Sequence, residues 1–421
     1  MSKWNAALGD CVSDLTDFTA NGSFADLKSN VTYYNDHNYA ALVRTTDLNK
    51  KDFRPEVFTD ERGYNFLEKS RLYGGEIVLA NVGSVGKVFR VPKSDIKMTL
   101  APNAYLVRFN PKQVDEEYIF QFLISNFYKG QLFKAIGSTT LQAMNKTSFR
   151  SIRFYKPPSL QEQKKIASIL RTADSVVEAS EAAIEKYKGI KQAMMHDLFT
   201  RGLDEHGKLR PLQTDAPELY KQSRLGWVPK DWDVVPISQV AQVNPEKRKA
   251  TDAPISYIDI ESVSDLSVKA TTEYSSPDIP SRAQIIVRSG DIITSNVRPN
   301  LRAFAHIGKN LDGCICSTGF TNLRPFDISS GYLFAQVQND RIFLAQLLVK
   351  TVGSSYPAVN STDVANVVIV KPDPSEQTLV EQRFSALDRE IYLSTALLLK
   401  TKMLKQSLMS DLLSGEVPVK A

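Results

Sequence analysis

The sequence predicts an α+β fold in which two α/β domains are separated by two long antiparallel coiled-coil helices, with a pseudo-twofold internal repeat. Three observations predict this fold: a heptad pattern that occurs twice, a looser duplication of the segments before it, and a polar linker between the copies. The 421 residues, 42% of them hydrophobic, are sufficient for several domains with cores of their own. The expected segments are a first domain at 1–157, a first helix at 158–200, a linker at 201–225, a second domain at 226–371, and a second helix with a C-terminal tail at 372–421.

Each domain is expected to contain a β-strand that ends at an asparagine. Residues 75–82 read Gly-Glu-Ile-Val-Leu-Ala-Asn-Val, and residues 290–297 read Gly-Asp-Ile-Ile-Thr-Ser-Asn-Val. In both stretches a turn glycine and an acidic residue precede an apolar, partly β-branched run, which is typical of a strand. The two stretches therefore predict that Asn81 and Asn296 occupy equivalent positions.

A helix and a polar loop are expected to follow in each domain. The helices are predicted at about 116–133 and 332–350, and each precedes a loop that contains glycine and serine. Prolines then break the chain before the long helices. The acid and amide pairs at 162–163 and 376–377 lie in the first helical turns, where a carboxylate stabilises the helix dipole.

The two long helices are predicted from apolar residues with alternating steps of three and four. Adding 214 (411 − 197) carries the first pattern onto the second, and the polar seam residues Ser180 and Lys191 recur as Ser394 and Lys405. A period of about 3.5 residues indicates a supercoiled pair, because such a stripe drifts around a straight helix. A core helix or a homodimeric zipper remains an alternative. The residues expected to pair the helices are Ile166, Leu170, Val177, Ile184, Met194, Leu198, Val380, Phe384, Leu387, Ile391, Leu398, Leu408 and Leu412.

Charge and cysteine content narrow the class of protein. The net charge is only +5, but the segment 129–156 contains basic residues and no Asp or Glu, which fits either phosphate contacts or a solvated face. Three cysteines without a Cys-x-x-Cys pair predict neither a disulfide framework nor a zinc ribbon. The chain begins without an apolar signal segment and has no run long enough for a membrane span, so a cytoplasmic protein is expected.

Four stretches carry a resemblance to a known family. Residues 157–170 read Pro-Pro-Ser-Leu-Gln-Glu-Gln-Lys-Lys-Ile-Ala-Ser-Ile-Leu, and 195–202 read Met-His-Asp-Leu-Phe-Thr-Arg-Gly. The second copy ends at 409–416 with Met-Ser-Asp-Leu-Leu-Ser-Gly-Glu, and 220–232 bridge into the second domain. Over essentially its whole length, the chain resembles the specificity (S) subunit of a type I restriction-modification enzyme.

This resemblance implies two target recognition domains, each of which reads a few base pairs of a split, asymmetric site in double-stranded DNA. It also implies that the helices set the unread spacer and dock two methyltransferase (M) subunits, which methylate adenine with S-adenosylmethionine. Restriction (R) subunits that use ATP and Mg²⁺ would complete the nuclease. The chain itself is expected to bind no cofactor. One departure is the loop at 83–86, whose glycines have no counterpart at 298–301.

No catalytic or metal-binding residue is predicted. The sequence has no Gly-x-Gly-x-x-Gly, no Walker-type loop and no adenine methyltransferase motif, and Asn244-Pro-Glu-Lys is interpreted as a turn. The four histidines lack metal-ligand spacing. Two other classes remain open: an enzyme acting alone, and a coiled-coil scaffold without sequence-specific DNA binding.

Residues expected to contact DNA are those whose side chains hydrogen-bond base edges or phosphates and whose positions fall in predicted loops. In the first domain they are Arg71, Asn81, Ser84, Lys87, Gln142, Asn145 and Lys146. In the second domain they are Asn296, Arg298, Asn300, Arg302, Thr318, Ser354, Tyr356 and Asn360.

Overall fold

The chain folds into two compact units, and each unit contains one globular domain and part of both long helices. The computed structural model describes residues 4–136, 143–249, 253–351 and 357–419. Unit 1 comprises Met1–Glu181 and Ala396–Ala421, and unit 2 comprises Ala182–Thr395.

The domain of unit 1 is built on two four-stranded sheets in its described part. The strands are β2 (Val12–Asp17), β3 (Ala40–Val43), β4 (Phe58–Thr59), β5 (Arg71–Leu72), β6 (Ile77–Ala80), β7 (Val88–Arg90), β8 (Met98–Leu100) and β9 (Ala104–Phe109). The first sheet has the order β2-β9-β6-β7 and is antiparallel. The second has the order β4-β3-β8-β5, with a parallel β3–β8 pair between antiparallel neighbours. The short strands β1 (Ala6–Ala7) and β10 (Arg153–Phe154) pair with each other.

The domain of unit 2 repeats this topology. Its corresponding strands are β14 (Ala241–Val243), β15 (Ile255–Ile258), β18 (Thr272–Tyr274), β19 (Ala283–Ile286), β20 (Ile292–Ser295), β21 (Phe304–His306), β22 (Ile315–Ser317) and β23 (Phe320–Pro325). The sheet orders are β14-β23-β20-β21 and β18-β15-β22-β19, and the β15–β22 pair is again parallel. The strand β13 (Asp233–Pro236) pairs with β24 (Val368–Lys371), as β1 pairs with β10. The remaining described strands are β11 (Tyr220–Ser223), β12 (Gly226–Pro229), β16 (Val263–Ser264) and β17 (Ser267–Val268).

The predicted strand in each domain is confirmed, and it lies inside its sheet. Strands β6 and β20 each have neighbours on both sides, and every residue of both strands is buried. Burial on both faces explains why these stretches read as continuous runs and do not alternate between apolar and polar residues.

The helices predicted at 116–133 and 332–350 are each broken. Ser125 ends α5 (Glu116–Ile124) because its hydroxyl donates to the Phe122 carbonyl at 2.6 Å. In unit 2 the side chain of Asn339 accepts hydrogen bonds from two backbone N–H groups and starts a new turn. The segments are α5, α6 (Asn126–Ile136), α9 (Ser330–Val337), the π-helix η7 (Asp340–Leu344) and α10 (Ala345–Leu348). Shorter helices are α1 (Leu8–Cys11), α2 (Phe24–Asn30), α3 (Thr45–Leu48), α4 (Glu61–Phe66), α7 (Lys146–Ser151) and α11 (Ser361–Ala365).

The duplicated long helices are confirmed as α8 (Leu160–Thr200) and α12 (Pro374–Ser414), each 41 residues long. Their bounds are shifted by 214 residues (374 − 160), as the sequence predicted. Both helices end at a glycine with positive φ, Gly202 at 66° after α8 and Gly415 at 73° after α12. A left-handed residue terminates a helix most readily when it lacks a Cβ.

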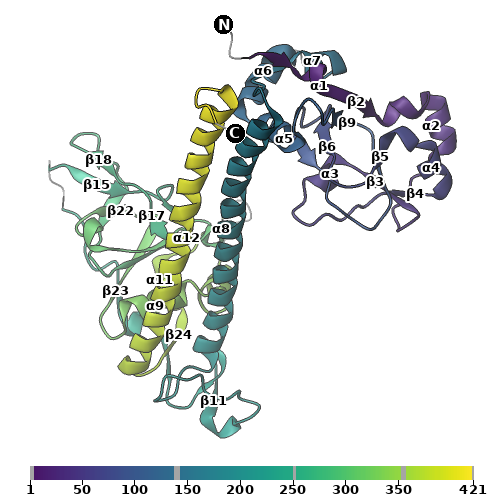
Figure 1. The fold of residues 1–421 in the computed structure, drawn as a ribbon. Helices are drawn as coiled ribbons and strands as arrows, with labels where there is room; N and C mark the ends of the chain where they lie inside the picture. The colour runs from purple at the N-terminus through teal and green to yellow at the C-terminus, as the bar shows by residue number, and fades with distance from the viewer. Residues whose placement is uncertain (1–3, 137–142, 250–252, 352–356, 420–421) are drawn as a thin grey trace. The chain divides into compact units, whose positions relative to one another are not determined.

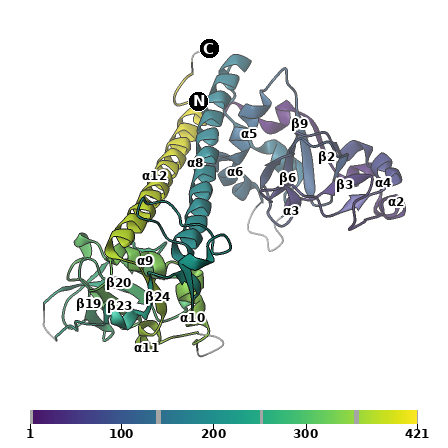
Figure 2. The same ribbon diagram turned by 90° about the horizontal axis from the view of Figure 1, so that it is seen from below.

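The two helices lie side by side and antiparallel within each unit (Figures 1 and 2). In unit 1, Glu181 accepts a hydrogen bond from Lys402 at 2.7 Å, whereas the earlier residue Asp174 pairs with the later residue Lys405. In unit 2, the rings of Phe199 and Phe384 stack with centroids 5.6 Å apart. Helix pairing within one chain therefore agrees with the prediction.

The pairing surface follows the heptad positions. Each residue that the sequence assigned to the seam is buried or half-buried. The two polar seam residues of α8, Ser180 and Lys191, are buried as well. The ends of the helices also contribute to the hydrophobic cores of the domains. The core of unit 1 includes Ile166, Leu170 and Leu412. Burial of each such side chain stabilises the fold by about 1.5–3 kcal/mol.

A glutamine in the first turn of each long helix ties it to a domain helix. Gln163 Oε1 accepts a hydrogen bond from the backbone N–H of Asp115, the N-cap of α5, at 2.8 Å. Gln377 Oε1 accepts one from Ser329, the N-cap of α9, also at 2.8 Å. Both glutamines are buried, so the duplicated amide fixes the start of the long helix against its own domain.

Candidate nucleic-acid interface

Asn81 and Asn296 occupy equivalent positions at the ends of β6 and β20, as predicted. The backbone N–H of Asn81 donates to the Asn103 carbonyl at 3.2 Å, and its carbonyl accepts from Met144 at 3.0 Å. In unit 2, Asn296 makes the corresponding bonds to Gly319 at 2.8 Å and Val359 at 2.9 Å. Each asparagine is therefore held between two chain segments, and both side chains are half-buried at the surface.

A second pair of asparagines caps the short helices α7 and α11. Asn145 Oδ1 accepts from the backbone N–H of Ser148 at 2.7 Å, and Asn360 Oδ1 accepts from that of Asp363 at 2.9 Å. Both residues were predicted to contact DNA. Their side-chain oxygens each accept a helix N–H, which is the ordinary function of an N-cap asparagine and needs no ligand to explain it.

In unit 1 a charged and aromatic cluster surrounds the first asparagine. Lys146 lies 3.0 Å from Asp17 and 5.7 Å from the centroid of the Tyr105 ring. The Tyr105 hydroxyl donates to the Met144 carbonyl at 2.9 Å, and the Met144 N–H donates to the Asn81 carbonyl. Asp17 and Asn81 also line an open cavity of about 680 Å³. The structure thus brings two of the predicted residues, Asn81 and Lys146, into one cluster.

The other predicted residues of unit 1 lie elsewhere. Arg71 is on β5 in the second sheet, where its guanidinium lies 4.5 Å from the centroid of the Tyr64 ring. Lys87 donates a hydrogen bond to Asn49. Ser84 is exposed in the turn after β6, and Gln142 lies outside the described residues.

In unit 2 the second asparagine has neutral polar neighbours. Thr321 Oγ1 lies 2.6 Å from Asn296 Oδ1 and 2.9 Å from Ser361 Oγ. Asn244 Nδ2 donates to Ser361 Oγ at 3.0 Å. Strand register makes Thr321 the counterpart of Tyr105, because Thr321 pairs with Thr294 on β20 as Tyr105 pairs with Leu79 on β6.

Two predicted arginines lie in a strained loop after Asn296. Arg298 and Arg302 both have left-handed backbones, with φ of 48° and 56°. For residues other than glycine this conformation is uncommon and is often found at functional sites. Arg302 donates to the Gln338 carbonyl at 2.5 Å and lies 3.5 Å from Asp340, so its guanidinium is held by its own domain.

The remaining predicted residues of unit 2 are peripheral or not described. Asn300 is exposed in a short 3-10 helix (Pro299–Leu301), and Thr318 is exposed on a turn, where its N–H donates to the Arg282 carbonyl at 2.9 Å. Ser354 and Tyr356 lie outside the described residues.

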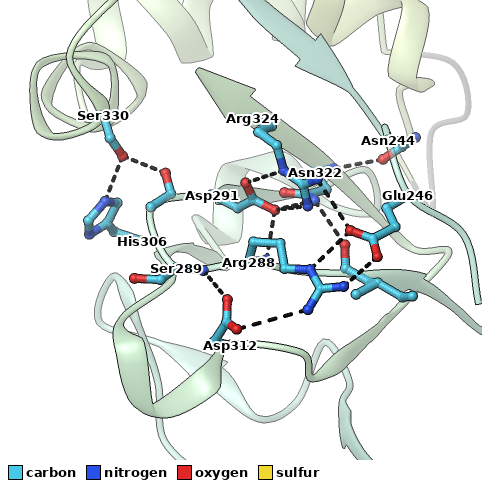
Figure 3. Close-up of polar contacts among 12 residues, drawn as sticks. Asn244, Glu246, Arg288, Ser289, Asp291, His306, Asp312, Asn322, Arg324 and Ser330 are labelled. Carbon is cyan, nitrogen blue, oxygen red and sulfur yellow. Dashed lines mark hydrogen bonds and ion pairs between the residues drawn. The ribbon is translucent and has the colours of Figure 1, made fainter. Parts of the chain in front are cut away.

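An ion network around the buried Asp291 lies at the first sheet of unit 2 (Figure 3). Asp291, which is 1% exposed, accepts hydrogen bonds from Arg324 at 2.9 Å and from the Asn322 amide at 2.8 Å. Glu246 accepts from Arg288 at 3.0 Å and from Arg324 at 3.3 Å. The hydrogen bonds from Arg288 lower the pKa of the Glu246 carboxyl. Because both arginines are paired with carboxylates, this network stabilises the domain rather than attracting phosphate.

The sequence did not reveal the function of Asn244. It was interpreted as part of a turn, and its backbone is indeed left-handed, with φ of 49°. The Asn244 side chain also accepts a hydrogen bond from the Asn322 N–H and donates one to Ser361. Asn244 and Ser361 are 117 residues apart in the sequence. A positive-φ asparagine followed by proline indicates the turn, but no sequence signal identifies a partner at that distance.

Metal-ligand clusters and membrane-spanning helices are not found where the structure describes the chain. No group of three or more His, Cys, Asp or Glu side chains there could hold a metal ion. Within the same residues, no helix has the length and apolar character needed to cross a membrane.

Comparison with known proteins shows similarity to DNA-specificity proteins of type I restriction enzymes. A family sequence model described as the type I restriction modification DNA specificity domain matches residues 11–186. The type I restriction enzyme MjaVIII specificity subunit of Methanocaldococcus jannaschii is 24% identical over 357 residues, which cover 82% of this chain and 79% of that protein. These matches show that residues 11–186 are similar to this DNA specificity domain, and that most of the chain is similar to a type I restriction enzyme specificity subunit.

Solved structures show the same fold. The type I restriction-modification S subunit from M. genitalium superimposes with a TM-score of 0.60 at 12% identity, covering 97% of this chain and 96% of that one. A second chain, from a study of complex assembly and conformational transition in the type I system, gives 0.52 at 16% identity and covers 98% of both chains. Subunits of this family are generally non-catalytic and work in a complex with other subunits and DNA.

Proposed function

We propose that this chain selects the DNA sequence at which a type I restriction-modification complex acts, and that each domain reads one half of a bipartite, asymmetric target. The family match and the internal duplication support this proposal. Two copies of one domain in a single chain are suited to two separate half-sites, as spacing between half-sites reflects the geometry of the protein that reads them.

The observation that carries the proposal is that equivalent backbone positions bear different chemistry. Asn81 and Asn296 end equivalent strands and make equivalent backbone bonds. Lys146 and Tyr105 lie near Asn81. Around Asn296, the corresponding positions are Ser361 and Thr321. Since base edges are distinguished by their donor and acceptor patterns, unlike side chains on one frame select unlike sequences. The two halves of the target are therefore expected to differ.

Large apolar side chains that are exposed along α12 support docking of partner subunits. Within unit 1, Leu397, Leu399, Met403 and Leu404 are each more than half exposed. Such a group of large apolar side chains marks a protein interaction site. We assign it to methyltransferase subunits, two per chain, which use S-adenosylmethionine, and restriction subunits that use ATP and Mg²⁺ complete the complex. On this proposal the partner subunits hold the catalytic groups and cofactors, and this chain contributes the choice of DNA sequence.

The proposal is tested by mapping methylated adenines in the DNA of cells that produce the chain with its methyltransferase partner. The expected result is one motif with two specified blocks and an unspecified gap. A control strain lacks only this chain and should lose the motif. A motif with a single block, or methylation that is unchanged in the control strain, contradicts the proposal.

A further inference from the structure

Asn296 lies at the end of a chain of hydrogen bonds that starts at a backbone N–H. The N–H of Asn322 donates to Asn244 Oδ1 at 2.8 Å (Figure 3). A backbone N–H can only donate, so the amide oxygen of Asn244 must face it. The amide nitrogen of Asn244 consequently faces Ser361 Oγ, to which it donates at 3.0 Å.

The direction continues through two hydroxyl groups. Ser361 Oγ already accepts from Asn244, and its own hydrogen has one acceptor among the described residues, Thr321 Oγ1 at 2.9 Å. Each hydroxyl has a single hydrogen, so that of Thr321 goes to Asn296 Oδ1 at 2.6 Å. With the Asn296 amide reversed, Thr321 would donate to Ser361, and the Ser361 hydrogen would have no acceptor in the described part of the chain.

The consequence is a fixed orientation of the Asn296 amide. Its oxygen is occupied by Thr321, which is fully buried. Its nitrogen makes no hydrogen bond with any residue that the structure describes, and the side chain is half-exposed. The backbone of Asn296 is fixed by bonds to Gly319 and Val359, so the group has little freedom to turn away.

We propose that Asn296 reads a hydrogen-bond acceptor on a base edge, and that Thr321, Ser361 and Asn244 are positioning residues that set this preference. The inference rests on the proposed DNA-reading function and adds the chemical identity of one contact. The acceptors available in the major groove are N7 of a purine, O6 of guanine and O4 of thymine. The paired contact with adenine N6 and N7 is disfavoured, because Thr321 already occupies one of the two lone pairs of the amide oxygen and fixes its direction.

Unit 1 lacks this arrangement at the equivalent asparagine. Tyr105 occupies the position of Thr321, and Lys146 follows its N-cap asparagine as Ser361 follows Asn360. Asn81 Oδ1 is buried without a hydrogen-bond partner in the described residues. The inference therefore concerns the half-site read by unit 2 alone.

The test measures binding of the assembled methyltransferase complex to duplexes in which single functional groups of the target are deleted. One set lacks an acceptor: carbon replaces N7, or guanine O6 or thymine O4 is absent. The other set lacks a donor, the amino group of adenine or cytosine. In the wild-type complex, deletion of one acceptor in one half-site should weaken binding roughly 2- to 10-fold, as expected for a single hydrogen bond. The same deletion should have no effect on the Asn296→Ala complex.

Two substitutions at Thr321 separate positioning from a structural effect. Thr321→Ser keeps the hydroxyl and should retain the sensitivity to acceptor deletion, whereas Thr321→Val removes the hydroxyl and should reduce it. The inference is overturned if Asn296→Ala abolishes the sensitivity of binding to deletion of an amino group, or if it changes the sensitivity to none of the deletions. It is also overturned if the Thr321→Val and Thr321→Ser complexes are equally sensitive to acceptor deletion. A wild-type complex without any sequence preference would overturn the proposed function as well, whereas a defined motif with one of these results overturns the inference alone.

Discussion

The most informative perturbation of stability compares two glutamates that the sequence makes equivalent. Glu162 and Glu376 start the two long helices at the same position of the repeat. In the structure Glu376 is 4% exposed and accepts hydrogen bonds from Leu203 N at 2.6 Å, Arg210 at 2.8 Å and Trp232 Nε1 at 2.9 Å. The Glu162 carboxylate accepts a hydrogen bond from the Ser159 N–H at 3.4 Å, in the manner of a capping box.

The expected cost of Glu376→Ala follows from these contacts. Removal of one partner of a buried ion pair costs about 3–5 kcal/mol. Arg210 retains Asp231 at 2.8 Å, which favours the lower end of that range. The Trp232 N–H would be left buried without a partner, which adds about 1–3 kcal/mol. For a domain of about 150–250 residues, a total of about 4–6 kcal/mol lowers the melting temperature by roughly 8–24 °C.

The assay is thermal unfolding of the full chain followed by near-ultraviolet circular dichroism. Trp227 and Trp232 lie in unit 2 and Trp4 lies in unit 1, so the signal follows the unfolding of both units. Glu162→Ala is the matched control, and loss of a cap contact should cost about 0.5–2 kcal/mol. Equal shifts for the two variants, or a shift below about 2 °C for Glu376→Ala, would refute the argument that the buried network sets the difference.

Three further predictions concern charge, pH and helix length. Lys146→Ala should weaken DNA binding about equally for all sequences and lower the salt slope by about one, measured by fluorescence anisotropy, whereas Lys188→Ala on α8 should leave the slope unchanged. Hydrogen bonds from Arg288 depress the pKa of the Glu246 carboxyl, so the stability that this carboxylate contributes is present at neutral pH and is lost as pH falls below about 4.3. When unfolding is measured as a function of acid pH, Glu246→Gln should lose less stability than the wild type. Insertion of one heptad at matched positions in α8 and α12 adds about 10 Å of helix and should lengthen the unread gap of the methylated motif by about three base pairs, with both blocks unchanged. A changed block with an unchanged gap would contradict the spacer function.

The duplication could be predicted because its signals are local. The heptad steps of α8 and α12 and the apolar runs of β6 and β20 depend on residues that are close together in the sequence, so one chain was sufficient to find them. The same reasoning missed the breaks at Ser125 and Asn339. There, a polar side chain competes with the backbone for hydrogen bonds, and the apolar pattern continues across the break.

The site was harder to predict because its contacts are distant in sequence. The equivalence of Asn81 and Asn296 could be predicted from the flanking strands. The partners of Asn296 could not, since Thr321 and Ser361 reach it only after folding. Identical residues also acquire different surroundings: Glu376 is enclosed by the linker residue Arg210, which belongs to neither copy of the repeat.

The most direct test of two independent reading domains is a pair of single substitutions followed by methylation mapping. Asn81→Ala and Asn296→Ala are introduced separately into the chain and produced with the methyltransferase partner. Each variant should relax the sequence requirement in one block of the motif, a different block for each, and leave the other block and the gap unchanged. If both variants alter the same block, or either one alters both, the assignment of one half-site to each domain is contradicted.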